Sequence, residues 1–502
     1  MNRSIISLAG ATAALAALTG AAVLTGAGDP AAAPVLTGAG DPAAAPVGSA
    51  ARQPVQRSAL VCPAPSASEL ASTTYTSFTP KGAQTGKQGT ARLLPATGDA
   101  SAKAKALAPL TEPGVPVTAK VEKADSPALI GTAEGGLAPG WSVQQTTVVG
   151  AGPGRAVLGT SCVAPDSEFW FPAASTAADR QDFLHLVNPD DLDAVVDVEL
   201  FGKDGALKAT TGDGVSVPSQ GSTSILLSTL ITEKVPDLTV HVTVRSGRVG
   251  AAVQAVDGKA GADWLPAAAD PAPSLVFPGI PADATSVQLV AYATGQDDAD
   301  LKVRLAAPTG SITPAGHETL HVKSGMTTTI ELGDVTKGEA GSLLLTASDA
   351  HAAAPIVAAL RVTRGTGAKQ ETAFLPATPK IDERATVADN RIKASTLSLV
   401  APDKEAVVKV TTSAATDGGA PVSKNVTIKA GTTLAMEPPA PSSGKGAFAV
   451  TVEPVSGGPV YASRMLSLPL NGIPMFTIQP MPDDRGTVVV PKVQPDLTIL
   501  DD

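Results

Sequence analysis

The sequence contains few charged and few aromatic residues. Charged residues make up 17% of its 502 residues and aromatic residues only 3%, and the formal net charge is −10 at pH 7. Proteins that bind nucleic acid usually carry a basic stripe with interleaved aromatic side chains, and this sequence has neither. We therefore expect no nucleic-acid partner, and we expect hydrophobic cores built from Ala, Val, Leu and Ile.

Cysteine is scarce as well. The two cysteines, Cys62 and Cys162, are too far apart for the CxxC spacing of zinc and redox sites. In an exported chain a disulfide between them is the expected state, with two buried free thiols as the alternative. The bond would close a loop of about 100 residues and, on the chain-entropy account, would contribute about 4–5 kcal/mol to stability.

The N-terminal 50 residues predict export. One positive side chain, Arg3, precedes an uncharged stretch over 5–28 that is rich in Ala, Leu and Thr. This order is typical of a secretory signal, and a buried Ala-rich helix is the alternative. The stretch is long enough to span a bilayer, so it is either cleaved or retained as an anchor in the plasma membrane. We expect an extracellular or cell-envelope protein that contacts the membrane only through this segment.

Two segments have low sequence complexity. The 12-residue sequence at 23–34 recurs unchanged at 35–46, which we interpret as an expansion within a disordered tether. Residues 80–127 mix Lys, Ala, Pro, Gly and Thr with almost no aromatic residues. We expect them to form a disordered insertion between the two cysteines.

An internal repeat organises the rest of the chain. An apolar strand that runs into proline is followed by a strand with an acidic turn, an alternating strand and two hairpins, and this order recurs. We take Pro172, Pro278 and Pro376 as equivalent, with spacings of 106 and 98 residues. Residues 59–168 resemble a fourth, degenerate copy. The expected domains are the signal and tether (1–50), the degenerate copy with its insertion (51–168), three repeats (169–270, 271–378 and 379–480) and a C-terminal tail (481–502).

The fold expected for each copy is a β-sandwich. Each copy has six or seven short runs in which apolar and polar residues alternate, and this period of two indicates strands. We predict an all-β protein of tandem Ig-like antiparallel β-sandwich domains after the N-terminal signal and tether. Short linkers predict a stiff, elongated array. Trp170 and Trp264 lie at the junctions and are interpreted as wedges between domains, with stacking on a ligand as the alternative.

Three stretches resemble a known family. Residues 188–207, 238–258 and 316–328 look like a family of secreted actinobacterial proteins, chiefly from Streptomyces and its relatives, whose function is unknown. The resemblance covers about residues 51–497. It implies export and a β-rich ectodomain, and it assigns no catalytic residue.

One motif matches a zinc protease. The sequence HETLH at 317–321 fits the H-E-x-x-H pattern, which places two histidines on one face of a helix. The repeat instead aligns residues 320–325 with a hairpin strand, where residues four apart lie roughly 13 Å from each other. His317 and His321 could not then share one zinc ion. We expect no metal there and no enzymatic activity.

Three further matches are also better explained without a site. LPATG at 94–98 has the form of a sortase signal but lies far from the C-terminus. The acidic turns at 190–193 and 297–300 could offer carboxylates to calcium, but the third copy has Lys404 there, so solvated turns are expected. GAGPGR at 150–155 has an arginine where the dinucleotide fingerprint needs its last glycine. No cofactor is expected.

Two functions compete at this point. The preferred one is a non-catalytic, exported or membrane-tethered cell-envelope protein whose tandem domains interact with an unidentified envelope protein or glycan. The alternative is a glycan-binding module or an accessory to a cell-wall enzyme. Sugar sites usually use exposed aromatic rings, and three Trp and three Tyr are few. A hydrolase with an unrecognised site is the third possibility.

Overall fold

The computed structural model describes residues 51–82, 89–98, 104–152 and 154–490. Residues Ala51–Val490 form one compact unit. Among the described residues of this unit, the regular elements are four short 3-10 helices and otherwise β-strands, and the sheets are antiparallel. The chain is therefore all-β, as the period of two predicts. The expected signal and duplicated tether lie outside the described residues.

Helices contribute little to this part of the chain. Its 3-10 helices are η2 (Gly135–Leu137), η3 (Leu227–Thr229), η4 (Ala350–Ala352) and η5 (Gly367–Lys369). Across the described residues, no helix has the length and apolar character needed to cross a membrane.

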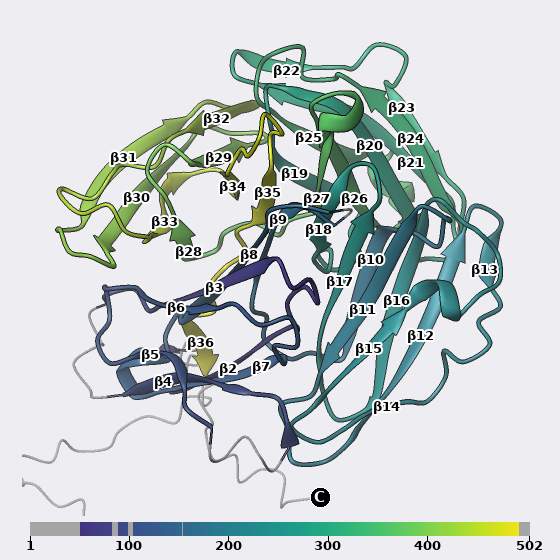
Figure 1. Ribbon diagram of the computed structural model, residues 1–502. Coiled ribbons are helices and arrows are strands. Elements are labelled where there is room, and N and C mark those ends of the chain that lie inside the picture. Colours follow the sequence, from purple (N-terminus) through teal and green to yellow (C-terminus); the bar gives the residue numbers. More distant parts are fainter. Residues whose placement is uncertain (1–50, 83–88, 99–103, 153, 491–502) are drawn as a thin grey trace, which may run out of the picture. The chain divides into compact units, whose positions relative to one another are not determined.

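Four β-sandwiches follow one another along the chain (Figure 1). Sandwich 1 contains β2 (Arg57–Cys62), β3 (Ala71–Phe78), β4 (Thr90–Pro95), β5 (Leu107–Leu110), β6 (Val117–Val121), β7 (Leu129–Glu134), β8 (Ser142–Val149) and β9 (Ala156–Ser161). Sandwich 2 contains β10 (Glu168–Ala174), β11 (Arg180–Val187), β12 (Ala194–Gly202), β13 (Gly205–Leu207), β14 (Val215–Val217), β15 (Ser222–Leu226), β16 (Leu238–Ser246), β17 (Gly250–Asp257) and β18 (Gly261–Leu265).

The other two sandwiches have the same size. Sandwich 3 contains β19 (Ser274–Ile280), β20 (Ala284–Ala293), β21 (Ala299–Ala307), β22 (Gly310–Ile312), β23 (Thr319–Val322), β24 (Thr327–Gly333), β25 (Gly341–Ala347), β26 (Ile356–Arg364) and β27 (Glu371–Pro376). Sandwich 4 contains β28 (Ala385–Asn390), β29 (Ser395–Ala401), β30 (Ala406–Ala415), β31 (Val422–Ile428), β32 (Thr432–Met436), β33 (Phe448–Gly457), β34 (Tyr461–Ser467) and β35 (Phe476–Pro480).

All four sandwiches share one strand order. In sandwich 2 one sheet runs β10-β16-β12-β13, with β14 also paired to β12, and the other runs β15-β11-β17-β18. Sandwich 1 has the corresponding sheets β2-β7-β4-β5 and β6-β3-β8-β9. The degenerate first copy therefore has the same topology as the three clearer repeats.

The structure corrects one equivalence within the repeat. Pro172 and Pro278 lie in β10 and β19, which are the first strands of sandwiches 2 and 3. Pro376 instead ends β27, the last strand of sandwich 3, and its counterpart is Pro266, directly after β18. Sandwich 4 begins with β28, which has no proline. The first and last strands of a copy resemble each other in sequence, because both are apolar runs that lead into a proline. The sequence pattern alone does not distinguish them.

The structure also contradicts the disordered insertion. Of residues 80–127, those that the structure describes include β4, β5 and β6. Leu93 of β4 and Leu110 of β5 are 0% and 2% exposed in the core of sandwich 1. The prediction failed because it relied on composition. A lack of aromatic residues is the rule throughout this chain, and alternate Ala and Leu residues suffice to build the strands.

The four sandwiches close into a ring instead of forming an open array. The last strand of each one faces the centre of Figure 1, where β9 contacts β18 and β35, and β27 contacts the same two strands. Sandwich 4 also contacts sandwich 1 directly through β28 and β8. The predicted elongated array is therefore wrong, because the apolar faces of the inner strands are covered by neighbours on both sides.

Apolar side chains pack across the boundaries between sandwiches. Trp264 of sandwich 2 packs on Val149 and Leu158 of sandwich 1. Trp170 packs on Tyr292 of sandwich 3, with ring centroids 5.5 Å apart. Both tryptophans are at most 8% exposed. The prediction that they are wedges between domains is confirmed.

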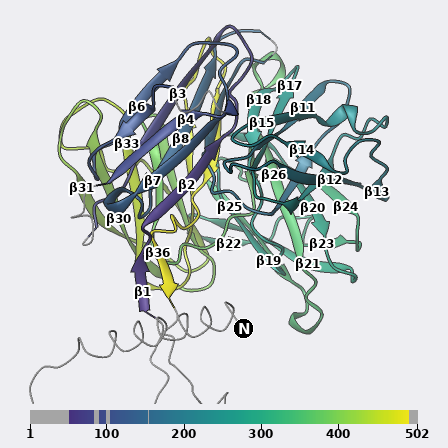
Figure 2. The same cartoon turned by 90° about the horizontal axis from the view of Figure 1, so that it is seen from below.

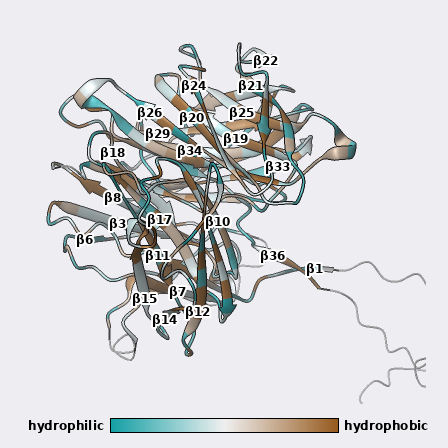
Figure 3. Ribbon diagram, turned by 90° about the vertical axis from the view of Figure 1, so that its right-hand side faces the viewer, coloured by the Kyte–Doolittle hydropathy of each residue, from teal (hydrophilic) through white to brown (hydrophobic). Residues whose placement is uncertain are grey.

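The ends of the ring meet in a two-stranded ribbon. Strand β1 (Ala51–Pro54) pairs antiparallel with β36 (Thr487–Val490), and Ala51 lies opposite Val490. The ribbon stands away from the sandwiches in both views of Figures 2 and 3. Part of the segment expected to be a C-terminal tail is thus a strand.

Candidate functional site

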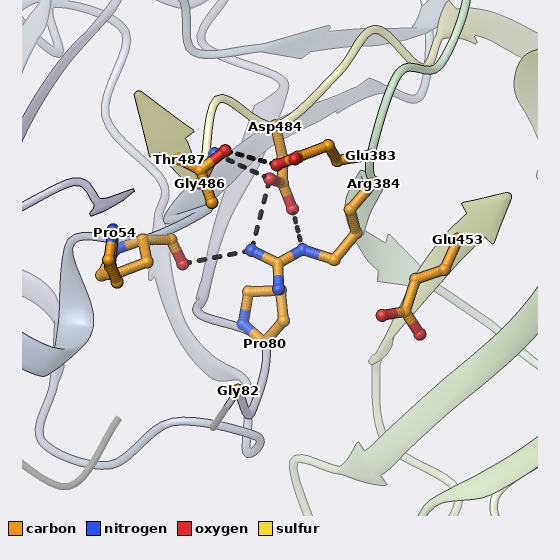
Figure 4. A pocket seen from close by; sticks show the side chains of 10 residues that line it. Pro54, Pro80, Gly82, Glu383, Arg384, Glu453, Asp484, Gly486 and Thr487 are labelled. Carbon is orange, nitrogen blue, oxygen red and sulfur yellow. Dashed lines mark hydrogen bonds and ion pairs between the residues drawn. The ribbon is translucent and has the colours of Figure 1, made fainter. Parts of the chain in front are cut away.

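A pocket lies where sandwich 1 meets sandwich 4 (Figure 4). We call it the closure pocket, and its volume is about 250 Å³. Prolines form much of its wall, and carboxylates and one guanidinium supply its polar groups. Its lining residues are Pro54, Pro80, Gly82, Pro139, Glu383, Arg384, Glu453, Asp484, Gly486 and Thr487.

Arg384 and Asp484 join the two sides of the pocket. Arg384 Nε donates to Asp484 Oδ2, and Arg384 Nη2 donates to the carbonyl oxygen of Pro139 in sandwich 1 at 3.4 Å. Asp484 also accepts hydrogen bonds from Thr386 Oγ1 (3.1 Å) and from the N–H of Gly486 (3.1 Å). Burial raises the pKa of Asp484, and its hydrogen bond with Arg384 offsets part of that rise. The pair therefore acts as a clamp across the closure.

The other carboxylates of the pocket are bonded too. Glu383 accepts hydrogen bonds from Arg52 of β1 and Thr487 of β36, which fixes the base of the ribbon. Glu453 forms an ion pair with Lys409 at 2.9 Å, and its side chain is 36% exposed. Figure 4 shows Glu453 to one side of Arg384, whose guanidinium is directed toward Asp484. Glu383 and Glu453 are thus about equally exposed, at 35% and 36% of their side chains, and Glu383 is the one held by hydrogen bonds to the ribbon.

A second polar cluster lies at the centre of the ring. Asp263 of β18 accepts hydrogen bonds from the N–H groups of Gly159 in β9 (3.1 Å) and Trp264 (2.8 Å), and Thr477 of β35 also bonds to it. Burial raises the pKa of Asp263 well above its ordinary value, and nearby Glu371 of β27 raises it further against those hydrogen bonds. Asp263 thus interacts with all three other inner strands.

Glu371 of β27 is the second carboxyl group of this cluster with a raised pKa. Burial raises its pKa to about 8, although Arg155 and the N–H of Val157 act in the opposite direction. Asp263 and Glu371 are 1% and 0% exposed. Solvent therefore does not reach either carboxyl group, and Asp263 Oδ1 bonds to the backbone of β9 and β18.

The inner strands approach each other closely beside this cluster. A Cβ atom on Gly159 would lie 2.5 Å from Gln479 Nε2 and 2.6 Å from Thr477 Cγ2, so only glycine fits there. Arg464 of β34 pairs with Gln479 in the sheet and is fully buried. Burial lowers the pKa of Arg464 to about 10, and the nearby Asp389 acts in the opposite direction.

We predict that Glu371 makes the ring less stable as the pH rises. Folding keeps a proton on Glu371 that the unfolded chain loses above its ordinary pKa near 4.5. The free energy of unfolding should therefore fall by about 1.4 kcal/mol per pH unit between pH 5 and the folded-state pKa near 8, and then level off. Glu371→Gln should remove this contribution, as urea unfolding at a series of pH values would show.

The difference in unfolding free energy between the original chain and Glu371→Gln isolates the contribution of Glu371. Shifted groups whose pKa does not depend on Glu371, such as His185, whose pKa burial lowers to about 4, are present in both proteins and cancel in the difference. Glu339→Gln, in an exposed turn, is the matched control and should follow the original chain. Parallel pH profiles for the original chain and Glu371→Gln would contradict the prediction.

The predicted disulfide is present. Cys62, the last residue of β2, is bonded to Cys162, which directly follows β9, and their Cα atoms are 4.5 Å apart. Next to it, Val61 and Val163 form an antiparallel bridge. The bond therefore ties one sheet of sandwich 1 to the other.

Thr319, Leu320 and His321 of HETLH lie on an edge strand, as the repeat predicts. In β23 the side chains of Leu320 and Val322 are buried and that of His321 is exposed. His321 Nδ1 is 2.8 Å from Asp300 Oδ1, and its Nε2 is 3.4 Å from Asp298. His317 precedes the strand in a turn that starts at Pro314. No cluster of metal-ligand residues occurs among the residues described.

The acidic turns direct their carboxylates to different protein groups. Asp190 pairs with Arg248 at 3.0 Å, and Asp193 accepts the N–H of Ser219 at 2.9 Å. Asp298 likewise accepts the N–H of Ser324 at 2.8 Å. These carboxylates hold neighbouring turns in place.

The two remaining motifs are structural as well. Leu94 and Pro95 of LPATG belong to β4, and Gly98 donates to the carbonyl of Gln220 at 2.9 Å. Arg155 of GAGPGR donates through Nη2 to the carbonyls of Ala368 (3.2 Å) and Gln370 (3.1 Å) in sandwich 3. Both segments thus contact another sandwich, Gly98 reaching sandwich 2 and Arg155 reaching sandwich 3.

Sequence reasoning missed the polar residues at the closure and at the centre. Asp263, Glu371 and Arg464 are charged residues in strands that are otherwise uncharged, and this was the available signal. Arg384 and Asp484 gave no such signal, because they lie 100 residues apart at the ends of sandwich 4.

The comparisons with known proteins identify a family without a known activity. No curated protein matches the chain. The model of a family of unknown function, DUF5719, matches residues 117–439, which run from β6 to just beyond β32 and make up more than half of the chain. The chain therefore belongs to the DUF5719 family.

Proposed function

We propose that this protein is a non-catalytic cell-envelope protein, exported or tethered to the membrane, that binds an envelope protein or glycan. The Cys62–Cys162 disulfide is the observation that carries this proposal. Such bonds persist in oxidising compartments outside the cytosol. The expected export segment over 5–28 supports the same location.

The closure pocket supports a binding role. Its polar walls are fixed by their own ion pairs, and preformed pockets are typical of binding sites. Glu453, paired only with the exposed Lys409, can accept hydrogen bonds from a partner. We prefer a protein partner, because the apolar wall consists of prolines such as Pro80 and Pro139, whereas sugars usually stack on aromatic rings.

Retention assays with a pocket variant would test this proposal. The purified full-length chain is immobilised and incubated separately with a detergent extract of envelopes and with purified peptidoglycan or arabinogalactan. We expect a partner that Glu453→Lys fails to retain, because the substitution reverses the charge at the pocket. Glu339→Lys, in an exposed turn of sandwich 3, should retain it. Equal retention by both variants, or turnover of the envelope material, would contradict the proposal.

A further inference from the structure

The free edge of β36 can be located from its pairing with β1. The N–H of Val55 donates to the carbonyl of Gly486 at 3.1 Å, so these two residues form a hydrogen-bonded pair. Hydrogen-bonded and non-hydrogen-bonded pairs alternate along an antiparallel ladder. Val488 therefore directs its N–H and C=O toward β1, whereas Thr487 and Val489 direct theirs to the opposite, free edge.

The equivalent edge of β1 is protected against pairing. Its outward-facing residues are Arg52 and Pro54. Pro54 has no N–H, and its carbonyl already accepts a hydrogen bond from Gln56 Nε2 at 3.1 Å. Arg52 adds a charge at this edge. Proline and charge are the usual devices that keep an exposed strand from pairing with another chain.

The edge of β36 has no such protection. Val488, Val489 and Val490 are 49%, 50% and 38% exposed, and residues 487–490 carry no charge. Strand β1 is its only partner among the strands that the structure describes. Figure 3 shows the ribbon projecting from the sandwiches, so a second strand would have room to approach. Exposed uncharged edges of this kind are templates for strand addition.

We propose that β36 pairs with β36 of a second copy of this chain. An antiparallel pair with its two-fold axis at Val488 places Thr487 opposite Val489 of the second copy. In this register the outward N–H and C=O groups of Thr487 and Val489 in each strand all find partners in the other strand. The pair makes four hydrogen bonds. An uncharged strand meets its own copy without repulsion, as an interface of two-fold symmetry requires. The two ribbons then form one four-stranded sheet.

The proposed contact is small. Four residues from each chain fall well below the roughly 1,200 Å² of a standard stable interface. Association should therefore be weak in dilute solution and favoured when copies are concentrated, for example on a membrane surface. Of the residues in β36, Thr487 also lines the closure pocket, so self-association and the partner proposed for the pocket are tested by different substitutions, at Val488 and Val489 and at Glu453.

A single cysteine can test the register. Val488→Cys introduces the only free thiol, because the two native cysteines are bonded to each other. Facing residues of a non-hydrogen-bonded pair have Cα atoms about 4.5 Å apart, within the range of a disulfide. We expect a disulfide-linked dimer of the full-length chain under mild oxidation. In Val490→Cys the two thiols would lie more than roughly 13 Å apart, and this control should remain monomeric.

A proline variant tests the edge without a crosslink. Val489→Pro removes an outward N–H and leaves the hydrogen bonds to β1 in place. Sedimentation of the original chain between about 10 µM and about 1 mM should show the mean mass rising toward twice that of one chain. The Val489→Pro variant should stay at the mass of one chain. Equal crosslinking of the two cysteine variants, or a monomer at every concentration, would overturn the proposal.

Discussion

Leu93→Asp is expected to unfold sandwich 1. Leu93 is fully buried in β4, where it packs with Leu129 and Trp141 in the core. The substitution buries a carboxylate without a partner, which costs several kcal/mol even after relaxation. That is comparable with the whole stability of a typical domain, about 5–15 kcal/mol. Fluorescence of Trp141, the tryptophan of this sandwich, would report the loss of its buried environment.

The neighbouring residue provides the control. Arg92 lies in the same strand with its side chain exposed. Arg92→Asp should change the free energy of unfolding by no more than about 0.5 kcal/mol. If both variants melted like the original chain, β4 would not belong to the core and the insertion would be disordered after all.

Loss of the disulfide is expected to lower the free energy of unfolding of sandwich 1 by about 4–5 kcal/mol. The bond joins residues separated by 100 positions, and without it the unfolded chain regains the freedom of that whole loop. The measurement is urea unfolding of Cys62→Ala/Cys162→Ala and of the original chain, each with and without reductant.

Reductant is the internal control for this prediction. It should lower the unfolding midpoint of the original chain to that of the double variant and leave the variant unchanged. A midpoint in the original chain that did not respond to complete reduction would show that the bond adds no stability. Mass spectrometry would verify that reduction was complete.

The individual sandwiches could be predicted because their information is local. Alternation of apolar and polar residues within strands such as β12 and β21 reports one buried and one exposed face. Turn residues and the repeat then delimit each copy. Closure of the ring is not local, since Thr477 and Gly159, which meet at the centre, are 318 residues apart. No period in the sequence reports such a contact.

A signal for the closure was nevertheless present. All residues of β18 and β27 are buried, so these strands show no alternation. A strand buried on both faces is characteristic of the interior of an assembly. Burial of both faces of the last strand therefore indicated that a second sandwich covers it. In an elongated array no second sandwich would be close enough to do so. The missed charges Asp263 and Glu371 lie in these same strands.

The closed ring has a consequence for how this protein can change over evolutionary time. Open repeat arrays gain and lose units easily, because each unit touches only its sequence neighbours. Here the contact of β9 with β35 fixes the number of copies. Gain or loss of one unit would separate those strands and expose both. We therefore expect a change in the number of copies to be costly, whereas changes within one copy leave the closure intact, as in the first copy, which retains the topology of the others.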